Sequence, residues 1–104
     1  MEEFLLKMAN FEGPLDLLLS LIEKRKLHVS DVSLAQVTDD YIAFIRSGEN
    51  ISVENMANFI LIASTLILIK SYSLISTLAV TEEEKADIKD LENRLKLYQR
   101  VREL

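Results

Sequence analysis

The most constraining feature of this sequence is an almost unbroken apolar run from Phe59 to Ile69, which reads FILIASTLILI. Nine of its eleven residues are apolar, and only Ser64 and Thr65 interrupt them. A helix that is apolar on every side has to be covered on every side. A chain of 104 residues builds one small domain with a modest core, so it has few other elements with which to cover this helix. We therefore expect a surface from outside the domain to complete the packing of this segment.

The remaining pattern predicts a mainly α, small four-helix domain. The apolar content is 49%, with only 2 Gly and 1 Pro, which is typical of a helical globular chain. Apolar residues recur at helical spacing in four segments, and we predict helices over about 14–25, 34–46, 53–75 and 82–103. Phe4, Leu6 and Met8 alternate with other residues, which predicts a short extended segment over residues 1–12.

Residue types that favour helix ends support these boundaries. Pro14 suits the first position of a helix, where its missing N–H costs no hydrogen bond. The expected capping groups are Ser33 with Gln36, Ser52 alone, and Thr81 with Glu84. The final predicted helix has a narrow apolar seam made of Ile88, Leu91, Leu95, Tyr98 and Val101.

The sequence offers little for catalysis or for binding a metal or cofactor. His28 is the only histidine and there is no cysteine, so a zinc site built from histidines or cysteines is not expected. His28 lies in a polar connection between helices, so we expect a solvated surface histidine and not a member of a catalytic triad. Asp39 and Asp40 are adjacent, so their side chains diverge on a helix and are expected to be solvated. Gly13 and Gly48 stand alone, which excludes a glycine-rich phosphate loop. We predict no enzyme activity, no metal and no cofactor.

The net charge and the hydropathy of the chain limit the classes of partner that it is expected to bind. The net charge of −5 and pI of about 4.8 disfavour direct binding to nucleic acid, and the basic stretch 24–26 is short. Residues 56–69 give roughly 14 residues before Lys70, against about 20 needed to cross a membrane. The acidic N-terminus does not resemble a signal peptide. We therefore expect a cytoplasmic protein that binds neither nucleic acid nor membrane directly.

Two stretches carry a family resemblance: NFEGPLDLLLSLIEKRKLHVSDVSLAQVTDDYIAFI, in which EGPLDLLL is most specific, and FILIASTLILIKSYSLI. Together, over about residues 8–76, they resemble the N-terminal part of segregation and condensation protein A, the bacterial and archaeal kleisin. The family's alanine, threonine, leucine and isoleucine-lysine-serine positions correspond to Ala63, Thr65, Leu66, Ile69, Lys70 and Ser71. The chain departs from the family where Leu68 replaces an acidic residue, Tyr72 a basic one and Ser76 a proline.

The resemblance implies a partner and a role in chromosome condensation and segregation. Kleisins bridge two SMC ATPases, and their N-terminal helical domain packs on the coiled-coil neck of one of them. A middle segment recruits segregation and condensation protein B, and a C-terminal winged-helix domain binds the other ATPase head. By this resemblance, residues 1–104 form the N-terminal helical domain, without the winged helix, associated with the nucleoid through SMC.

The predicted partner-binding side of the 53–75 helix consists of Leu61, Thr65, Leu68, Tyr72 and Ile75. The family's typical charges on this side indicate that it is not the domain's own core. A wider apolar side includes Met56, Ile60 and Ile67, and its stripe Phe59, Ala63, Leu66 and Leu74 is predicted to pack on the first two helices. Two alternatives stay open: both sides are internal core with the last helix covering the second, or the chain is a self-associating helical scaffold that forms a homodimer.

Overall fold

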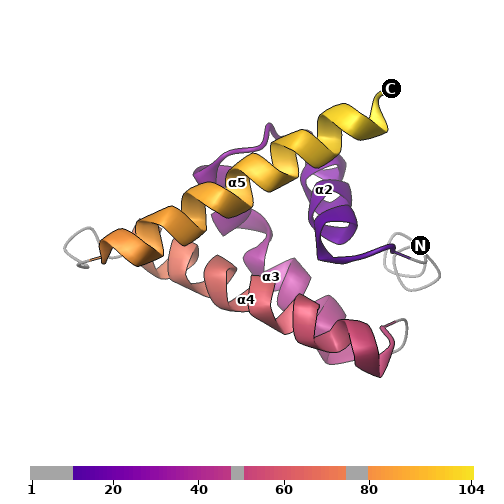
Figure 1. Cartoon of the computed structure of the whole chain (residues 1–104), viewed down its shortest axis with the longest axis horizontal. Coiled ribbons are helices and arrows are strands. Elements are labelled where there is room, and N and C mark those ends of the chain that lie inside the picture. The colour runs from indigo at the N-terminus through magenta and orange to yellow at the C-terminus, as the bar shows by residue number, and fades with distance from the viewer. Residues whose placement is uncertain (1–10, 48–50, 75–79) are drawn as a thin grey trace.

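The computed structural model describes residues 11–47, 51–74 and 80–104. Over this part the chain forms α2 (Pro14–Lys24), α3 (Asp31–Ser47), α4 (Val53–Leu74) and α5 (Glu82–Arg102), with no strand (Figure 1). The mainly α, four-helix prediction is confirmed. Most of the predicted extended segment over 1–12 lies outside the described residues, as does Ile75.

α2 contacts each of the other three helices, α3 most extensively and α4 least. α3 and α4 form the most extensive helix pair, and α2 packs against α3. α5 starts near the end of α4 and runs away from it towards α2, so the two longest helices diverge along their length (Figure 1). As a consequence, α5 covers only part of α4.

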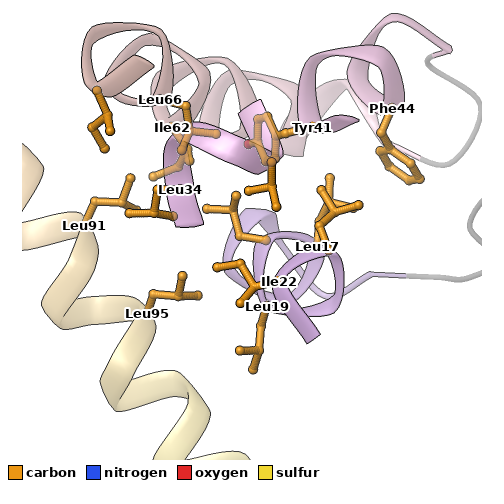
Figure 2. Packing of buried hydrophobic residues seen from close by; sticks show 14 of the residues in the cluster. Leu17, Leu19, Ile22, Leu34, Tyr41, Phe44, Ile62, Leu66, Leu91 and Leu95 are labelled. Atoms are coloured by element: carbon orange, nitrogen blue, oxygen red, sulfur yellow. The ribbon is translucent and has the colours of Figure 1, made fainter. Parts of the chain in front are cut away.

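The hydrophobic core lies where α2 meets the three longer helices (Figure 2). α2 is short and contributes five buried residues, because its leucine run LDLLLSLI places an apolar side chain on nearly every side. α5 contributes only two buried residues, Leu91 and Leu95. Val101, predicted to continue this seam, is mostly exposed, so the buried seam ends with the half-buried Tyr98. The buried apolar residues are Leu17, Leu18, Leu19, Leu21, Ile22, Leu34, Val37, Tyr41, Phe44, Phe59, Ile62, Leu66, Ile69, Leu91 and Leu95.

Two of the three predicted helix caps are confirmed. The Glu84 N–H donates to Thr81 Oγ1 at 3.0 Å, and the Thr81 N–H donates to Glu84 Oε1 at 3.0 Å, which completes a capping box. At the start of α4, the Asn55 N–H donates to Ser52 Oγ at 3.2 Å.

The predicted cap at Ser33 is wrong, because α3 begins three residues before the predicted start. Ser30 takes this role: its Oγ accepts the Ser33 N–H at 3.2 Å, and its own N–H donates to Ser33 Oγ at 2.9 Å. Ser33 is buried within the first turn of α3, and its hydroxyl also donates to the Ser30 carbonyl oxygen. Ser33 is therefore a residue of the helix itself, and the hydrogen bonds expected of a cap are exchanged between Ser30 and Ser33.

The face of α4 that packs on α3 differs from the predicted stripe. Phe59 and Leu66 are buried and Ala63 packs against the core, as predicted, but Leu74 is 72% exposed. The buried positions on α4 are Phe59, Ile62, Leu66 and Ile69. At about 100° per residue, Leu74 lies on a different side of the helix from these four residues. The prediction that Leu74 packs in the core is therefore wrong.

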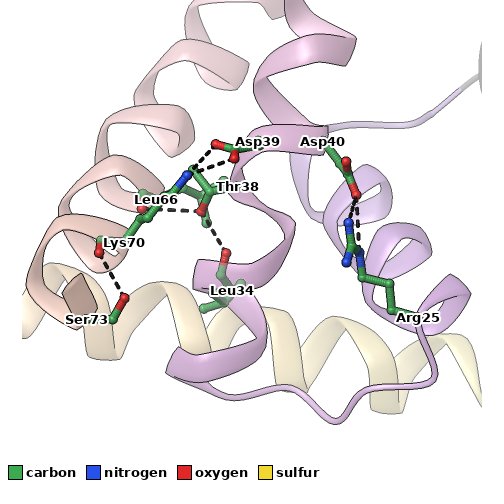
Figure 3. A network of polar contacts seen from close by, with 8 residues as sticks. All are labelled: Arg25, Leu34, Thr38, Asp39, Asp40, Leu66, Lys70 and Ser73. Carbon is green, nitrogen blue, oxygen red and sulfur yellow. Dashed lines mark hydrogen bonds and ion pairs between the residues drawn. The ribbon is translucent and has the colours of Figure 1, made fainter.

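Polar contacts link α3 to its neighbours (Figure 3). Lys70 Nζ of α4 lies 2.7 Å and 2.8 Å from the two carboxylate oxygens of Asp39. Asp40 Oδ2 accepts from Arg25 at 2.6 Å and 3.2 Å. The two aspartates thus diverge as predicted, but neither is simply solvated: Asp39 forms an ion pair with α4, and Asp40 forms one with Arg25, the residue that follows α2. The buried Tyr41 hydroxyl donates to the Phe59 carbonyl oxygen at 2.7 Å, which adds a second link between α3 and α4.

Candidate partner-binding face of α4

α4 is only partly covered by the rest of the described chain. In the most apolar stretch of 18 residues within α4, only 22% is buried inside the domain. By length and composition α4 could cross a membrane, but a single such helix is weak evidence because core helices pass the same test. The expectation that the chain binds no membrane stays a prediction.

The structure brings four of the five predicted partner-binding residues onto one side of α4, which we call the first strip: Leu61, Thr65, Leu68 and Tyr72. Leu61 is 67% exposed and Tyr72 is 48% exposed. Thr65 and Leu68, between them, are half-buried. The alternative that α5 buries this side does not hold for Leu61 and Tyr72.

Two hollows between α4 and α5 lie at the ends of the first strip. A hollow of about 360 Å³ includes Leu61 and lies between the start of α2, α4 and Tyr98 of α5. A hollow of about 420 Å³ includes Tyr72 and has apolar walls from Ile69 and Ile88. Each exposed end of the strip therefore has a hollow beside it.

A second exposed apolar strip lies on the wider apolar side of the helix, and of its three residues only Leu74 was predicted to pack in the core. Ile60 is 52% exposed, Ile67 is 50% exposed, and Leu74 continues the row. We call these three residues the outer strip. They recur every seven residues, the spacing of a helix–helix contact position, and this repeat is the sequence signal that could have identified them.

The exposed face of α4 is almost free of charge. The helix contains only two charged residues, Glu54 and Lys70. Lys70 is bound by Asp39, as described above. Apolar contact is therefore the interaction that this face can offer, and any helix that covers it needs uncharged residues opposite both strips.

Among the residues that the structure describes, three ionisable groups have a raised pKa. Burial raises the pKa of Tyr41 well above its ordinary value. Burial, and then the nearby Glu92 carboxylate, raises the pKa of Asp31 beside the larger hollow. The pKa of Tyr98 is raised by burial and then by nearby carboxylates. In the part of the chain that the structure describes, no three His, Asp or Glu side chains gather as a metal site would require.

Comparison with known proteins agrees with the resemblance noted from the sequence. The family model described as segregation and condensation protein ScpA matches residues 21–104. This range extends the resemblance from about residue 76 through α5. No solved structure matches the chain.

Among curated relatives, segregation and condensation protein A of Clostridium tetani (strain Massachusetts / E88) is 40% identical over 83 residues, which cover 80% of this chain and 33% of the relative. That of Exiguobacterium sibiricum is 38% identical over 92 residues, covering 88% of the chain and 36% of the relative. That of Clostridium perfringens (strain 13 / Type A) is 34% identical over 106 residues, covering 100% of this chain and 43% of the relative. The chain thus spans less than half the length of these relatives.

Proposed function

Because the chain belongs to the segregation and condensation protein A family, we propose that it acts in chromosome segregation and condensation as a non-enzymatic domain that binds the coiled-coil neck of an SMC ATPase. The observation that carries this proposal is the first strip on α4, whose two ends stay exposed although they are apolar. Large apolar side chains that stay exposed on one side of a helix are a feature of protein–protein interaction sites.

The proposed contact is a helix laid into a groove. Leu61 and Leu68 are seven residues apart, so they meet the same side of a neighbouring helix at successive turns. Burying a leucine side chain completely contributes about 1.5–3 kcal/mol. Leu61 is two-thirds exposed, so docking would still gain about two-thirds of that amount, roughly 1–2 kcal/mol. The hollows beside Leu61 and Tyr72 offer room for side chains of the partner.

The remaining parts of the proposal concern location and other partners. We place the domain in the cytoplasm, associated with the nucleoid through SMC. Direct contact with DNA is not expected, because the net charge is −5 and Arg25 of the basic stretch is bound to Asp40. Binding to segregation and condensation protein B is proposed for the full-length protein and not for this domain.

A competing function is self-association as a helical scaffold, which the exposed outer strip favours. Sedimentation velocity of this chain at micromolar concentrations distinguishes the two. A monomer that binds the neck supports the proposal, and a stable homodimer that does not bind it supports the scaffold.

The proposal is tested by measuring binding of the chain to two SMC fragments, one with the neck and one with the head alone. We expect binding to the neck fragment only. Leu61→Asp should weaken it at least tenfold while the circular dichroism spectrum and the melting temperature stay near wild type. Leu97→Asp is the matched control, because Leu97 is an exposed leucine on the outer side of α5. Equal affinity of the wild type and Leu61→Asp for the neck, or no neck binding at all, would refute the proposal.

A further inference from the structure

α5 faces the same side of α4 that carries the first strip. The α4 residues that line the two hollows together with α5 are Asn58, Leu61, Ile62, Ile69, Tyr72 and Ser73. At 100° per residue they span about 120° of the helix circumference. Leu61 and Tyr72 belong both to this arc and to the first strip, and the half-buried Thr65 lies between them on the same side. α5 therefore flanks the strip at both of its ends.

A partner helix centred on the first strip would compete with α5 for space. At 100° per residue, the centre of the strip and the centre of the arc that faces α5 are about 50° apart. Helices of equal diameter packed around a central helix are at least about 60° apart. A helix that contacts the whole strip therefore requires α5 to move away from α4.

α5 is attached to the rest of the domain by few contacts for its length. It buries two of its 21 residues, Leu91 and Leu95, whereas the 11 residues of α2 include five that are buried. The Arg102 guanidinium lies 3.5 Å from Asp16 and 3.6 Å from Glu23 of α2. Because the Arg102 side chain is 43% exposed, these ion pairs contribute little to the attachment.

The contacts that keep α5 helical are local, and so are those that join the other helices. The capping box of Thr81 and Glu84 lies within α5 and its N-cap, as does the ion pair of Lys96 with Glu92 at 3.4 Å. α3 packs directly against both α2 and α4. Moving α5 away breaks none of these contacts. A segment with few buried contacts of its own, beside a core that packs without it, is the kind of unit that opens separately.

We propose that α5 is a strap that opens as one unit from α2, α3 and α4 and thereby controls access to the first strip. In the closed state the ends of the strip, Leu61 and Tyr72, are exposed and its middle is half-buried. In the open state the whole strip is available to one partner helix. The opening is a property of this chain alone, whereas the coupling to a partner rests on the proposed function.

Hydrogen–deuterium exchange of the free chain, followed by mass spectrometry, tests the opening. We expect the amides of α5 to exchange faster than those of α3. Leu95→Ala removes a buried contact of α5 and should speed exchange of α5 at least tenfold. The smaller truncation Leu95→Val should act in the same direction if Leu95→Ala does not fold.

Tyr41→Phe is the matched control, because it removes a hydrogen bond between α3 and α4 and leaves α5 untouched. It should speed exchange of the slowest α3 amides about fivefold without changing exchange of α5. If Tyr41→Phe speeds exchange of α5 as much as that of α3, α5 opens only when the whole domain unfolds, and the strap is refuted.

The same measurement with the SMC neck fragment tests the control of access. We expect the neck to slow exchange of α4 and to speed exchange of α5. Leu95→Ala should bind the neck more tightly than the wild type, because a larger fraction of the variant is already open. Slower exchange of α4 with unchanged or slower exchange of α5 would show that the strap does not control access, while neck binding stands. If neither the wild type nor Leu95→Ala binds the neck, the proposed function fails, and exchange of the free chain still decides whether α5 opens alone.

Discussion

Replacing Leu61 and Leu66 separately with alanine tests whether the first strip is a surface or a part of the core. The two substitutions remove the same atoms from the same helix. Leu66 is fully buried, whereas Leu61 is two-thirds exposed. The comparison therefore isolates burial from side-chain chemistry and from helix propensity.

The structure gives a different magnitude for each substitution. A buried leucine replaced by alanine costs about 2–5 kcal/mol, because the transfer free energy is lost and a cavity remains. Leu61 buries only about a third of its surface, so Leu61→Ala should cost about a third of the 1.5–3 kcal/mol for full burial, or roughly 0.5–1 kcal/mol. Since a domain is typically stable by about 5–15 kcal/mol, Leu66→Ala should remove a large part of that free energy.

The assay is urea unfolding followed by far-ultraviolet circular dichroism, with the free energy of unfolding from linear extrapolation. Each variant is measured at two protein concentrations, so that self-association would appear as a concentration dependence. If Leu61→Ala lowers the free energy of unfolding as much as Leu66→Ala does, Leu61 is buried in the free domain. The first strip would then be core, and it could not be a docking surface.

Further predictions concern the polar contacts of the fold. Tyr41→Phe removes the hydrogen bond to the Phe59 carbonyl and should cost about 1 kcal/mol at pH 7. Because burial raises the pKa of Tyr41, the wild type should lose stability as pH rises above about 10. The difference from Tyr41→Phe should therefore shrink there, and a constant difference from pH 7 to 11 in unfolding experiments would contradict this assignment. Thr81→Ala deletes the hydroxyl of the α5 capping box and should cost about 1 kcal/mol in thermal unfolding, whereas an unchanged melting temperature would argue against an ordered cap. Lys70→Ala should cost at most about 1 kcal/mol, and less in high salt, because Asp39 is largely exposed. A larger, salt-independent loss would show a buried role for Lys70.

The sequence predicted the helices well because their signals are local. The described bounds of α2, α4 and α5 lie within one residue of the predicted ends, and Ser52 and Thr81 cap as expected. α3 is the exception, because Ser30 and Ser33 both have the chemistry of a cap. Only the burial of Ser33 decides between them, and burial is a tertiary property.

The orientation of α4 could not be predicted in the same way. A helix with isoleucine or leucine on nearly every side has almost no amphipathic signal, so Ile62 and Ile69 look the same in sequence as Ile60 and Ile67. The structure separates them by how α3 packs: the first pair is buried and the second is half exposed. The predicted partner-binding side of α4 came from the family resemblance and not from the periodicity, and it stays a prediction.

The most direct test of the central claim is a methyl nuclear magnetic resonance titration of the isoleucine- and leucine-labelled chain with the SMC neck fragment. The account predicts that the Leu61 and Leu68 methyl signals shift or broaden as the neck is added, while Leu97 on the outer side of α5 does not change. Unchanged Leu61 and Leu68 signals at a saturating neck concentration, or changes confined to α5, would show that the exposed face of α4 is not the binding surface.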